Sequence, residues 1–450
     1  MSRSTRRRFP LVISLALFAS VGCPSRWISP STPLTWLTSQ LVNSGIDPVR
    51  TVIRSNDDYK NKAHIYTDAL AVIVFTHAGR TDIAQRILDT YWWIYTNSAG
   101  EGRDHSSGLL YDERDVNALV PALNKGKEGF RSGENAWLVM AINYYEVRTG
   151  DDSYAPFAVE LLDKIIELRE DVDTEPAYGA FRWNDLDPWN TWYSTEFQHD
   201  IYSALRVRAE LSGDSDFEQY AEDLRNYLTY DVECYYPFSL CTPKPKVWLR
   251  WNDPVFNGEL FDGDTTTYSD AQTWGVLSLF PPEPGEPDFY QALYSIDDEP
   301  GGNSDEDWSG CMRADVMCDG ITTRGFKSVC SVDADYVQIE FTLFFVAASQ
   351  LIGEPERAQY FLGSVEHLLS HGSLIHSCAN DGTPIDWPEN YRKPSVDATA
   401  WYYFVTHNIN PFQPAAPPPV PSLSTPGMAL LASPLLGAAL LIRRRRIAGR

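Results

Sequence analysis

Six acidic residues each open a run of apolar and aromatic residues at helical spacing, and the runs follow one another at intervals of roughly 60 to 70 residues. If these runs are the inner helices of one closed ring, all six acidic ends point to the same mouth. Carboxylates gathered over one concave surface could perform acid/base chemistry on a neutral polymer such as a glycan. The six opening residues are Asp68, Glu134, Glu196, Asp270, Asp335 and Asp397.

Cleavage of a glycosidic bond needs one carboxylic acid to protonate the leaving oxygen and one carboxylate to activate water or attack carbon. A helix N-terminus stabilises an ionised carboxylate, and a second carboxylate crowded against the first is driven towards its protonated form. Helix capping is the structural alternative for any one of these acids. We add Glu340 to the catalytic candidates. A helix that begins at Asp335 would hold Glu340 more than one turn inside, where helix capping does not explain a carboxyl group. We therefore expect two catalytic residues among Glu134, Asp270, Glu196 and Glu340.

Aromatic and amide side chains adjoin these acids and suit a sugar-binding surface. The chain holds 14 Trp and 24 Tyr, and aromatic faces stack on the apolar faces of sugar rings, although core and loop packing is the alternative. No paired histidine ligands or complete calcium loop occur, so neither a metal nor a cofactor is predicted. The predicted substrate-binding residues are Asp68, Asn135, Trp137, Trp183, Trp192, Gln272, Trp274 and Asp397.

The elements that must position these residues are predicted to be six helical hairpins. Residues 68–78 are apolar nearly all round, as in a helix buried on every side. Gly79 suits a left-handed helix end, and residues 81–92 then form a helix with a single apolar face. The same order of buried helix, turn and one-sided helix recurs along the chain. The further inner helices are predicted over 134–147, 195–211, 270–280, 335–351 and 395–407, and the further outer helices around 157–168, 217–228, 289–293 and 360–369.

The sixth inner helix lacks an outer partner after it, so segment 34–42 is expected to supply one and close the ring. Six such pairs are the pattern of an all-α (α/α)6 toroid, formed by residues 27–412 as one domain. No series of alternating strands is present, which excludes a TIM barrel.

Several of these segments resemble the six-hairpin glycosidase-like proteins over most of residues 66–412. The resemblance implies an (α/α)6 barrel with a sugar-binding mouth at the N-terminal ends of the inner helices. Two segments depart from the family pattern: Glu196-Phe197-Gln198-His199-Asp200 stands where relatives often carry Glu-His-Asn, and Glu340-Phe341-Thr342 stands where they carry Glu-Gly-Thr. The segments that carry the resemblance are Tyr66-Thr67-Asp68-Ala69-Leu70-Ala71, Gly133-Glu134-Asn135-Ala136-Trp137, Ser194-Thr195-Glu196, Asp270-Ala271-Gln272-Thr273-Trp274-Gly275, Thr399-Ala400-Trp401 and Asn410-Pro411-Phe412.

The formal net charge of −24 argues against nucleic acids and anionic membranes as partners and disfavours a polyanionic substrate. We therefore predict a monomeric, exported glycoside hydrolase that acts on a neutral oligo- or polysaccharide, with inversion at the anomeric carbon as the first mechanism to consider. The alternatives are a polysaccharide lyase or a sugar epimerase on the same fold, and a surface protein that binds glycans without catalysis.

Both ends of the chain indicate delivery to the cell envelope. Residues 1–23 combine arginines with a short apolar stretch, as in an export signal. Residues 413–426 form a proline-rich linker and a short motif, and residues 427–450 hold an apolar stretch followed by four arginines. This tail resembles bacterial C-terminal sorting signals of the PEP/IPTL type, and an ordinary tail anchor is the alternative. Either reading places the body outside the cytoplasm, periplasmic or at the cell surface, with sorting or membrane-anchoring machinery as a partner.

Six cysteines in the second half of an exported chain favour disulfide bonds over a zinc site. The expected pairs are Cys234–Cys241, Cys311–Cys318 and Cys330–Cys378. Such staples indicate long loop insertions in that half of the barrel.

Overall fold

The computed structural model describes residues 31–44, 50–55, 61–97, 108–119, 130–172, 177–184, 193–229, 251–253, 262–263, 269–282, 293, 297, 313–318, 320–327, 336–370, 372–379 and 393–414. The predicted export signal and the tail from residue 415 onward lie outside these ranges. Among the described residues, none of the helices is both long and apolar enough to cross a membrane.

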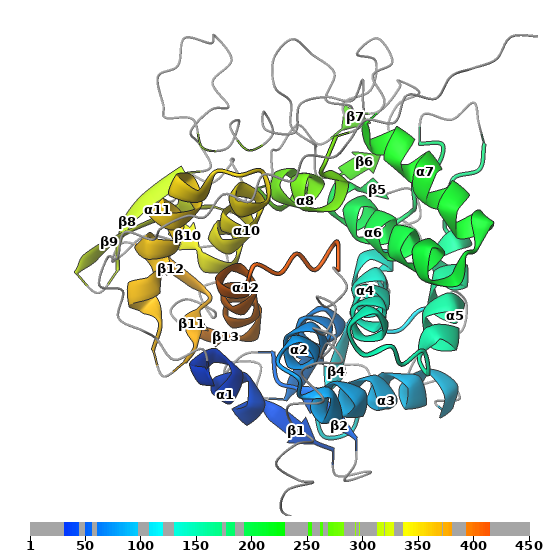
Figure 1. The fold of residues 1–450 in the computed structure, drawn as a ribbon, viewed down its shortest axis with the longest axis horizontal. Helices are drawn as coiled ribbons and strands as arrows, with labels where there is room; N and C mark the ends of the chain where they lie inside the picture. The colour runs from blue at the N-terminus through cyan, green and yellow to red at the C-terminus, as the bar shows by residue number, and fades with distance from the viewer. Residues whose placement is uncertain are drawn as a thin grey trace, which may run out of the picture.

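Six inner helices surround the centre of the molecule and form the predicted all-α ring (Figure 1). Neighbours along the chain pack against one another, and the last helix packs against the first, so the ring is closed. Their side chains are buried on nearly every side, which explains why these segments are apolar all round. The inner helices are α2 (Ile65–His77), α4 (Ser132–Thr149), α6 (Thr195–Ser212), α8 (Ser269–Leu279), α10 (Ile339–Leu351) and α12 (Val396–His407).

Outer helices pack behind the inner ones and present one apolar face to them. On α3, for example, Ile83, Ile87 and Tyr91 are buried against the ring. The short helix α1 packs against α12, which confirms the predicted closure by the segment before the first inner helix. The predicted outer partner of α8 lies outside the described residues, apart from the buried Leu293. The described outer helices are α1 (Ser31–Ser39), α3 (Thr81–Asn97), α5 (Ala155–Ile166), α7 (Ser215–Thr229) and α11 (Pro355–Val365).

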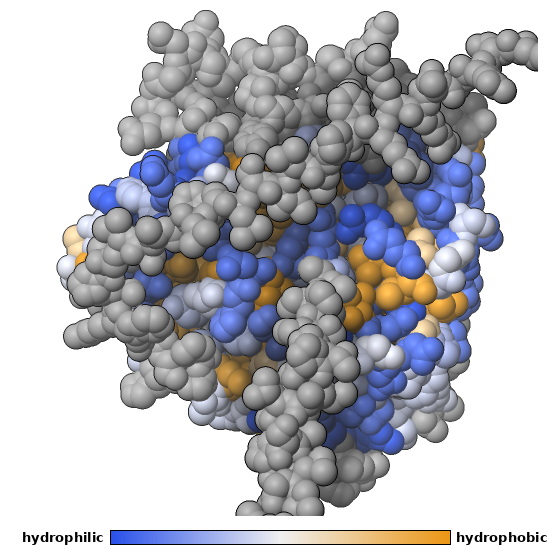
Figure 2. Space-filling view, viewed as in Figure 1, coloured by the Kyte–Doolittle hydropathy of each residue, from blue (hydrophilic) through white to orange (hydrophobic). Residues whose placement is uncertain are grey.

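Glycines in the left-handed conformation end two of the inner helices. Gly150 and Gly213 follow α4 and α6 with φ angles of 73° and 70°, in the left-handed region that favours glycine. Their backbone N–H groups donate to the carbonyl oxygens of Glu146 and Ala209, so the chain turns at once into the outer helix. Hydrophilic side chains cover much of the outer rim of the molecule, and apolar side chains show between them towards the middle of the face (Figure 2).

Short strands, which the sequence did not indicate, precede four of the inner helices directly. β3 (Lys62–His64) runs into α2, β5 (Tyr193–Ser194) into α6, and β13 (Pro394–Ser395) into α12. Each strand pairs with a partner: β3 with β4 (Glu113–Asp115), β5 with β6 (Trp251–Asp253), which also pairs with β7 (Asp262–Gly263), and β13 with β11 (Leu374–Ile375). β1 (Leu41–Asn43) and β2 (Thr51–Ile53) form a further pair. The pairings hold the start of each helix in place.

The fourth such strand corrects the predicted start of the fifth inner helix. Residues Tyr336–Gln338 form β10, which pairs with β12 (Ser377–Ala379), and α10 begins only at Ile339. The prediction that this helix begins at Asp335 is therefore wrong, and Glu340 lies in the first turn rather than deep inside the helix.

One disulfide bond, Cys318–Cys378, joins two strands of a four-stranded sheet, with the Cα atoms 6.2 Å apart. Cys318 ends β8 (Arg313–Cys318), which forms a hairpin with β9 (Ile321–Phe326), and Cys378 lies in β12. The predicted pairs Cys311–Cys318 and Cys330–Cys378 are therefore wrong, because folding of the hairpin carries Cys318 to a strand far away in sequence. The remaining cysteines, including the predicted pair Cys234–Cys241, lie outside the described residues.

The segment after α12 closes the end of the ring that lies opposite the starts of the inner helices. It runs from α12 across the centre of the ring in Figure 1. The Asn410 side chain donates to the carbonyl oxygen of Leu277 (2.8 Å), and the Gln413 side chain donates to that of Phe280 (2.7 Å). Both acceptors lie at the C-terminal end of α8. Between these anchors, Phe412 is fully buried.

Candidate active site

A pocket of about 230 Å³ lies where the inner helices begin, and all six of them contribute side chains to it. The helix N-termini meet here because every inner helix runs in the same direction from this mouth, as the sequence predicts. The lining residues are Ser55, His64, Tyr66, Thr67, Glu134, Trp137, Glu196, Phe197, Asp200, Asp270, Trp274, Glu340, Phe341, Phe344, His376 and Asp397.

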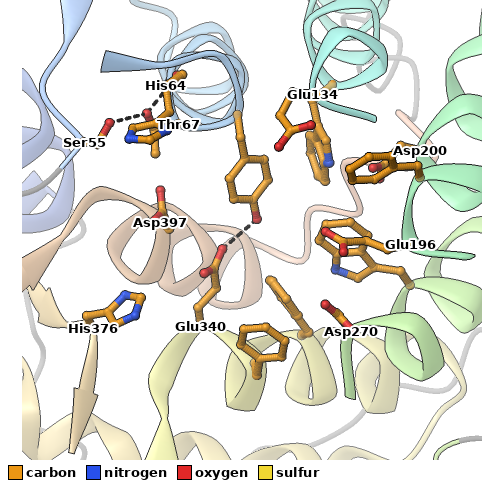
Figure 3. A pocket seen from close by; sticks show the side chains of 16 residues that line it. Ser55, His64, Thr67, Glu134, Glu196, Asp200, Asp270, Glu340, His376 and Asp397 are labelled. Carbon is orange, nitrogen blue, oxygen red and sulfur yellow. Dashed lines mark hydrogen bonds between the residues drawn. The ribbon is translucent and has the colours of Figure 1, made fainter. Parts of the chain in front are cut away.

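Among the described residues, six carboxyl groups line this pocket, and they form two groups that face each other across it (Figure 3). We call the pair Glu340 and Asp397 the Glu340 group. The four carboxyl groups on the other side form the Glu196 group, and they are Glu134, Glu196, Asp200 and Asp270.

Tyr66 holds Glu340 in place within the Glu340 group. The Tyr66 hydroxyl donates to Glu340 Oε1 (2.6 Å) and accepts from Trp401 Nε1 (2.8 Å), so the tyrosine proton is directed at the carboxyl group (Figure 3). Burial and the nearby Glu340 raise the pKa of Tyr66 well above its usual value, so the hydroxyl keeps this proton.

The Glu340 group holds a proton near neutral pH. Burial, with the nearby Asp397, raises the pKa of Glu340 well above its usual value, although the hydrogen bond from Tyr66 opposes this shift. Burial also raises the pKa of Asp397 to about 7. Two carboxyl groups this close in a buried place do not both ionise readily.

The Glu196 group combines a carboxyl group paired with an arginine and a buried carboxyl group with a raised pKa. Arg131 Nη1 donates to Glu134 Oε1 (2.9 Å), and the guanidinium lies over the ring of Trp183, 5.1 Å from its centroid. Asp200 follows Glu196 by one helical turn on α6 and is fully buried. Burial, followed by the charges of Glu196, Glu134 and Asp270, raises the pKa of Asp200 well above its usual value. Asp200 therefore holds a proton more readily than an ordinary aspartate.

Aromatic rings form the floor of the pocket one helical turn below the carboxyl groups. Trp137, Trp274 and Phe344 follow Glu134, Asp270 and Glu340 by three or four residues, which places them on the same helix face at a deeper level. The ring centroids of Trp137 and Trp274 lie 5.5 Å apart, and those of Trp274 and Phe344 lie 5.3 Å apart. Each of these side chains is at most 3% exposed, so together they close the pocket with a packed apolar layer.

Three buried polar atoms at the pocket make no hydrogen bond within the part of the chain that the structure describes. They are Glu134 Oε2, Trp274 Nε1 and Asp397 Oδ1. Buried polar groups are normally hydrogen-bonded in folded proteins. Each exposes less than 1 Å², so a polar ligand would satisfy them only after their side chains turn towards the pocket.

Seven of the predicted site residues line the pocket together. All four predicted catalytic residues do so, and three predicted substrate-binding residues join them. They are Glu134, Glu196, Asp270, Glu340, Trp137, Trp274 and Asp397.

Asp68 does not lie in the pocket. Its two carboxylate oxygens accept from the backbone N–H of Ile53 (2.7 Å) and from the hydroxyl of Tyr91 (2.8 Å), and it is fully buried. In α2 the second residue is Tyr66, whereas in four other inner helices that position holds an acid: Glu196, Asp270, Glu340 or Asp397. Asp68 comes two residues later and is thus turned by about 200° around the helix. It is not placed to bind substrate as predicted.

Asn135 and Gln272 are turned away from the pocket for the same reason. Asn135 lies one residue past Glu134 and bonds to the backbone of Leu110, whereas Gln272 lies two residues past Asp270 and is fully buried. Trp183 packs behind the wall against Phe197, with ring centroids 4.6 Å apart. Trp192 lies outside the described residues.

Four functional candidates escaped the sequence prediction: Tyr66, Asp200, His64 and His376. Asp200 could have been found, because its distance of four residues from Glu196 places both on one helix face. Tyr66 required the helix start to be known to the residue. His64 lies in β3, and His376 lies between β11 and β12, in segments with no helical pattern.

No family model matches the chain, and no curated protein sequence matches it either. Solved structures do match. A wild-type glycosidase has a TM-score of 0.56 and 11% sequence identity, with 85% of this chain and 96% of that chain covered. An α-amylase from Clostridium perfringens has a TM-score of 0.52 and 10% sequence identity, with 84% of this chain and 97% of that chain covered. A sugar epimerase from a ruminal bacterium has a TM-score of 0.52 and 12% sequence identity, with 84% of this chain and 96% of that chain covered. At these identities the likeness shows the fold: this chain shares its six-hairpin ring with glycosidases and with a sugar epimerase.

Proposed function

We propose that this protein is a carbohydrate-active enzyme, a glycoside hydrolase that cleaves a neutral glycan with one carboxyl group from each side of the pocket. The observation that carries this proposal is that the Glu340 group and the Glu196 group face each other above an aromatic floor (Figure 3). Glycoside hydrolysis uses two carboxyl groups on opposite sides of the bond. The glycosidase and α-amylase among the similar folds support the same reaction class.

Glu340 is the best candidate on its side because Tyr66 fixes its orientation. On the other side we favour Glu196. Glu134 accepts a hydrogen bond from Arg131, and Asp200 is fully buried, whereas Glu196 is only partly buried at the pocket. Asp270 accepts from the backbone N–H of Ala271 (2.7 Å) and is suited to orient a sugar hydroxyl.

In this reaction one of the two carboxyl groups donates a proton to the leaving glycosidic oxygen as its bond to the anomeric carbon breaks. The other removes a proton from a water molecule, whose oxygen forms the new bond to that carbon from the opposite face. The positive charge that develops on the sugar ring is stabilised by the surrounding carboxylates. Inversion is the proposed outcome, and it requires the two carboxyl groups to lie about 6.5–9.5 Å apart, with room for a water molecule between sugar and base.

A sugar epimerase is the second candidate function. His64 and His376 line the pocket and could exchange a proton on a sugar carbon, and one similar fold belongs to a sugar epimerase. A lyase acting on uronates has less support, because no lysine or arginine is among the described residues of the lining.

The test is a panel of neutral oligosaccharides incubated with the wild type and with E196Q and E340Q. We expect the wild type to release new reducing ends and each variant to lose about 10²- to 10⁴-fold in kcat. D68N is the matched control, since Asp68 is an acid in the first turn of an inner helix that does not face the pocket. NMR of the products separates the alternatives: a changed configuration with the glycosidic bond intact indicates an epimerase, and binding without any product indicates a non-catalytic protein.

We also propose export to the cell envelope, as the sequences of residues 1–23 and 413–450 indicate. The disulfide Cys318–Cys378 supports this proposal, because such bonds persist mainly in oxidising compartments. Fractionation of cells that express the full chain tests it, with recovery in the cytoplasmic fraction as the contrary result.

A further inference from the structure

The depth of the pocket is set by the aromatic floor. Trp137, Trp274 and Phe344 lie one helical turn below the carboxyl groups of their helices, and one turn corresponds to about 5.4 Å along the helix axis. The space between floor and carboxyl groups is therefore about as deep as one sugar ring is wide.

The floor is closed from behind by the segment after α12. Phe412 is fully buried, and its ring centroid lies 5.3 Å from that of Trp137 and 5.5 Å from that of Trp274. Side chains of Asn410 and Gln413 tie this segment to the end of α8. A glycan that enters between the carboxyl groups therefore meets a packed aromatic layer rather than a channel through the ring.

The volume of the pocket, about 230 Å³, also indicates a small occupant. It lies below the range of about 300–1,000 Å³ that is typical of pockets for drug-sized ligands. The carboxyl groups of Glu134 and Asp397 line it on opposite sides, so they can bond to hydroxyls around one ring.

We infer that the pocket takes a single terminal sugar unit, so that the enzyme removes sugars one at a time from a chain end. This inference rests on the proposed hydrolase function. The terminal unit stacks on the floor, the bond to be cut lies at the level of Glu196 and Glu340, and the rest of the chain leaves through the mouth.

The experiment follows the products of the wild type over time on malto-, cello-, laminari- and manno-oligosaccharides. For the series that is cleaved, a second sample carries a 4,6-O-ethylidene group on the non-reducing terminal unit. We expect a monosaccharide as the first product, and a rate on the blocked sample reduced by about 100-fold or more, because a unit that cannot enter loses its transition-state contacts.

A first product mixture of several chain lengths, with the blocked sample cleaved at the normal rate, overturns the inference and leaves the hydrolase function intact. Absence of any cleavage contradicts the hydrolase function instead, and the size of the site is then read from binding. Trp137 and Trp274 line the pocket, so tryptophan fluorescence reports occupancy. Affinities within about threefold for mono-, di- and trisaccharides support a one-unit site, and a gain of about tenfold with each added unit overturns it.

Discussion

Substitution of Tyr66 by phenylalanine removes the support of Glu340 and leaves the aromatic ring in place. The lost hydroxyl donates to Glu340 Oε1 at 2.6 Å and accepts from Trp401 Nε1 at 2.8 Å. A hydrogen bond to a charged group contributes about 1.5–3 kcal/mol. If the bond acts in full in the transition state, kcat falls by about 10- to 160-fold, since about 1.36 kcal/mol corresponds to a factor of ten.

The pH dependence of kcat gives a readout that a purely structural role of Tyr66 would not change. The hydrogen bond from Tyr66 lowers the pKa of Glu340 against the larger raising effects of burial and Asp397. Its loss therefore raises the pKa of Glu340 further, and the limb of the pH profile that Glu340 controls should move to higher pH. The assay is kcat measured across the pH range on the best substrate of the panel.

Y91F is the matched control for Y66F. Tyr91 donates to Asp68 Oδ2 at 2.8 Å, and that carboxyl group is buried outside the pocket. Both variants should lose stability, by about 1–3 kcal/mol where a buried polar partner is left without a bond, but only Y66F should lose activity. A wild-type kcat and an unmoved pH limb in Y66F would refute the role given to Tyr66.

Three further predictions concern stability. Burial raises the pKa of Asp68 from 3.8 to about 7, so its stabilising effect is full below about pH 4 and is lost as the pH rises through about 7. In D68N the free energy of unfolding, measured with urea, should therefore depend less on pH over this range. A pH dependence equal to that of the wild type would contradict this prediction. Burial, with Arg148 and His407 nearby, lowers the pKa of His77 from 6.5, so the stability that is present above pH 6.5 is lost as the pH falls through the lower folded value. The melting temperature of H77Q should therefore fall less than that of the wild type between pH 7 and pH 5. Equal decreases in the two proteins would count against this prediction. The Cys318–Cys378 disulfide spans 60 residues, which corresponds to about 4 kcal/mol of loop entropy in the unfolded chain. The variant with both cysteines replaced by serine should unfold at a lower denaturant concentration. An unchanged midpoint of unfolding would show that the bond does not stabilise the fold.

The ring could be predicted from the sequence because its signals are local. A helix buried on all sides is apolar all round, as α2 and α10 are, and glycine at a left-handed position marks the end of a helix, as after α4 and α6. Closure by α1 followed from counting hairpins, since the sixth inner helix needed a partner. These features depend on a few neighbouring residues.

The short strands at the mouth could not be predicted in this way. β10 has three residues and pairs with β12, about 40 residues further on, so its signal comes from a distant partner. The disulfide between Cys318 and Cys378 depends on the same sheet. Two wrong predictions, the start of α10 and the cysteine pairing, come from these long-range contacts.

The site was predicted at the level of helix starts but not of individual side chains. One residue corresponds to about 100° of rotation around a helix, so a small error in the start decides whether a side chain faces the pocket. Glu196 and Asp270 are correctly placed at the pocket, whereas Asp68 and Gln272 point elsewhere and Tyr66 takes the place expected of Asp68.

The most direct test of the central claim compares E196Q and E340Q on glycosides with good and poor leaving groups. If carboxyl groups from opposite sides act as acid and base, the variant that lacks the acid regains most of its rate with a good leaving group, such as fluoride or dinitrophenolate, because departure then needs no proton. The variant that lacks the base stays slow on every substrate. Two variants with the same dependence on the leaving group, or with wild-type rates, would contradict the division of labour between Glu196 and Glu340.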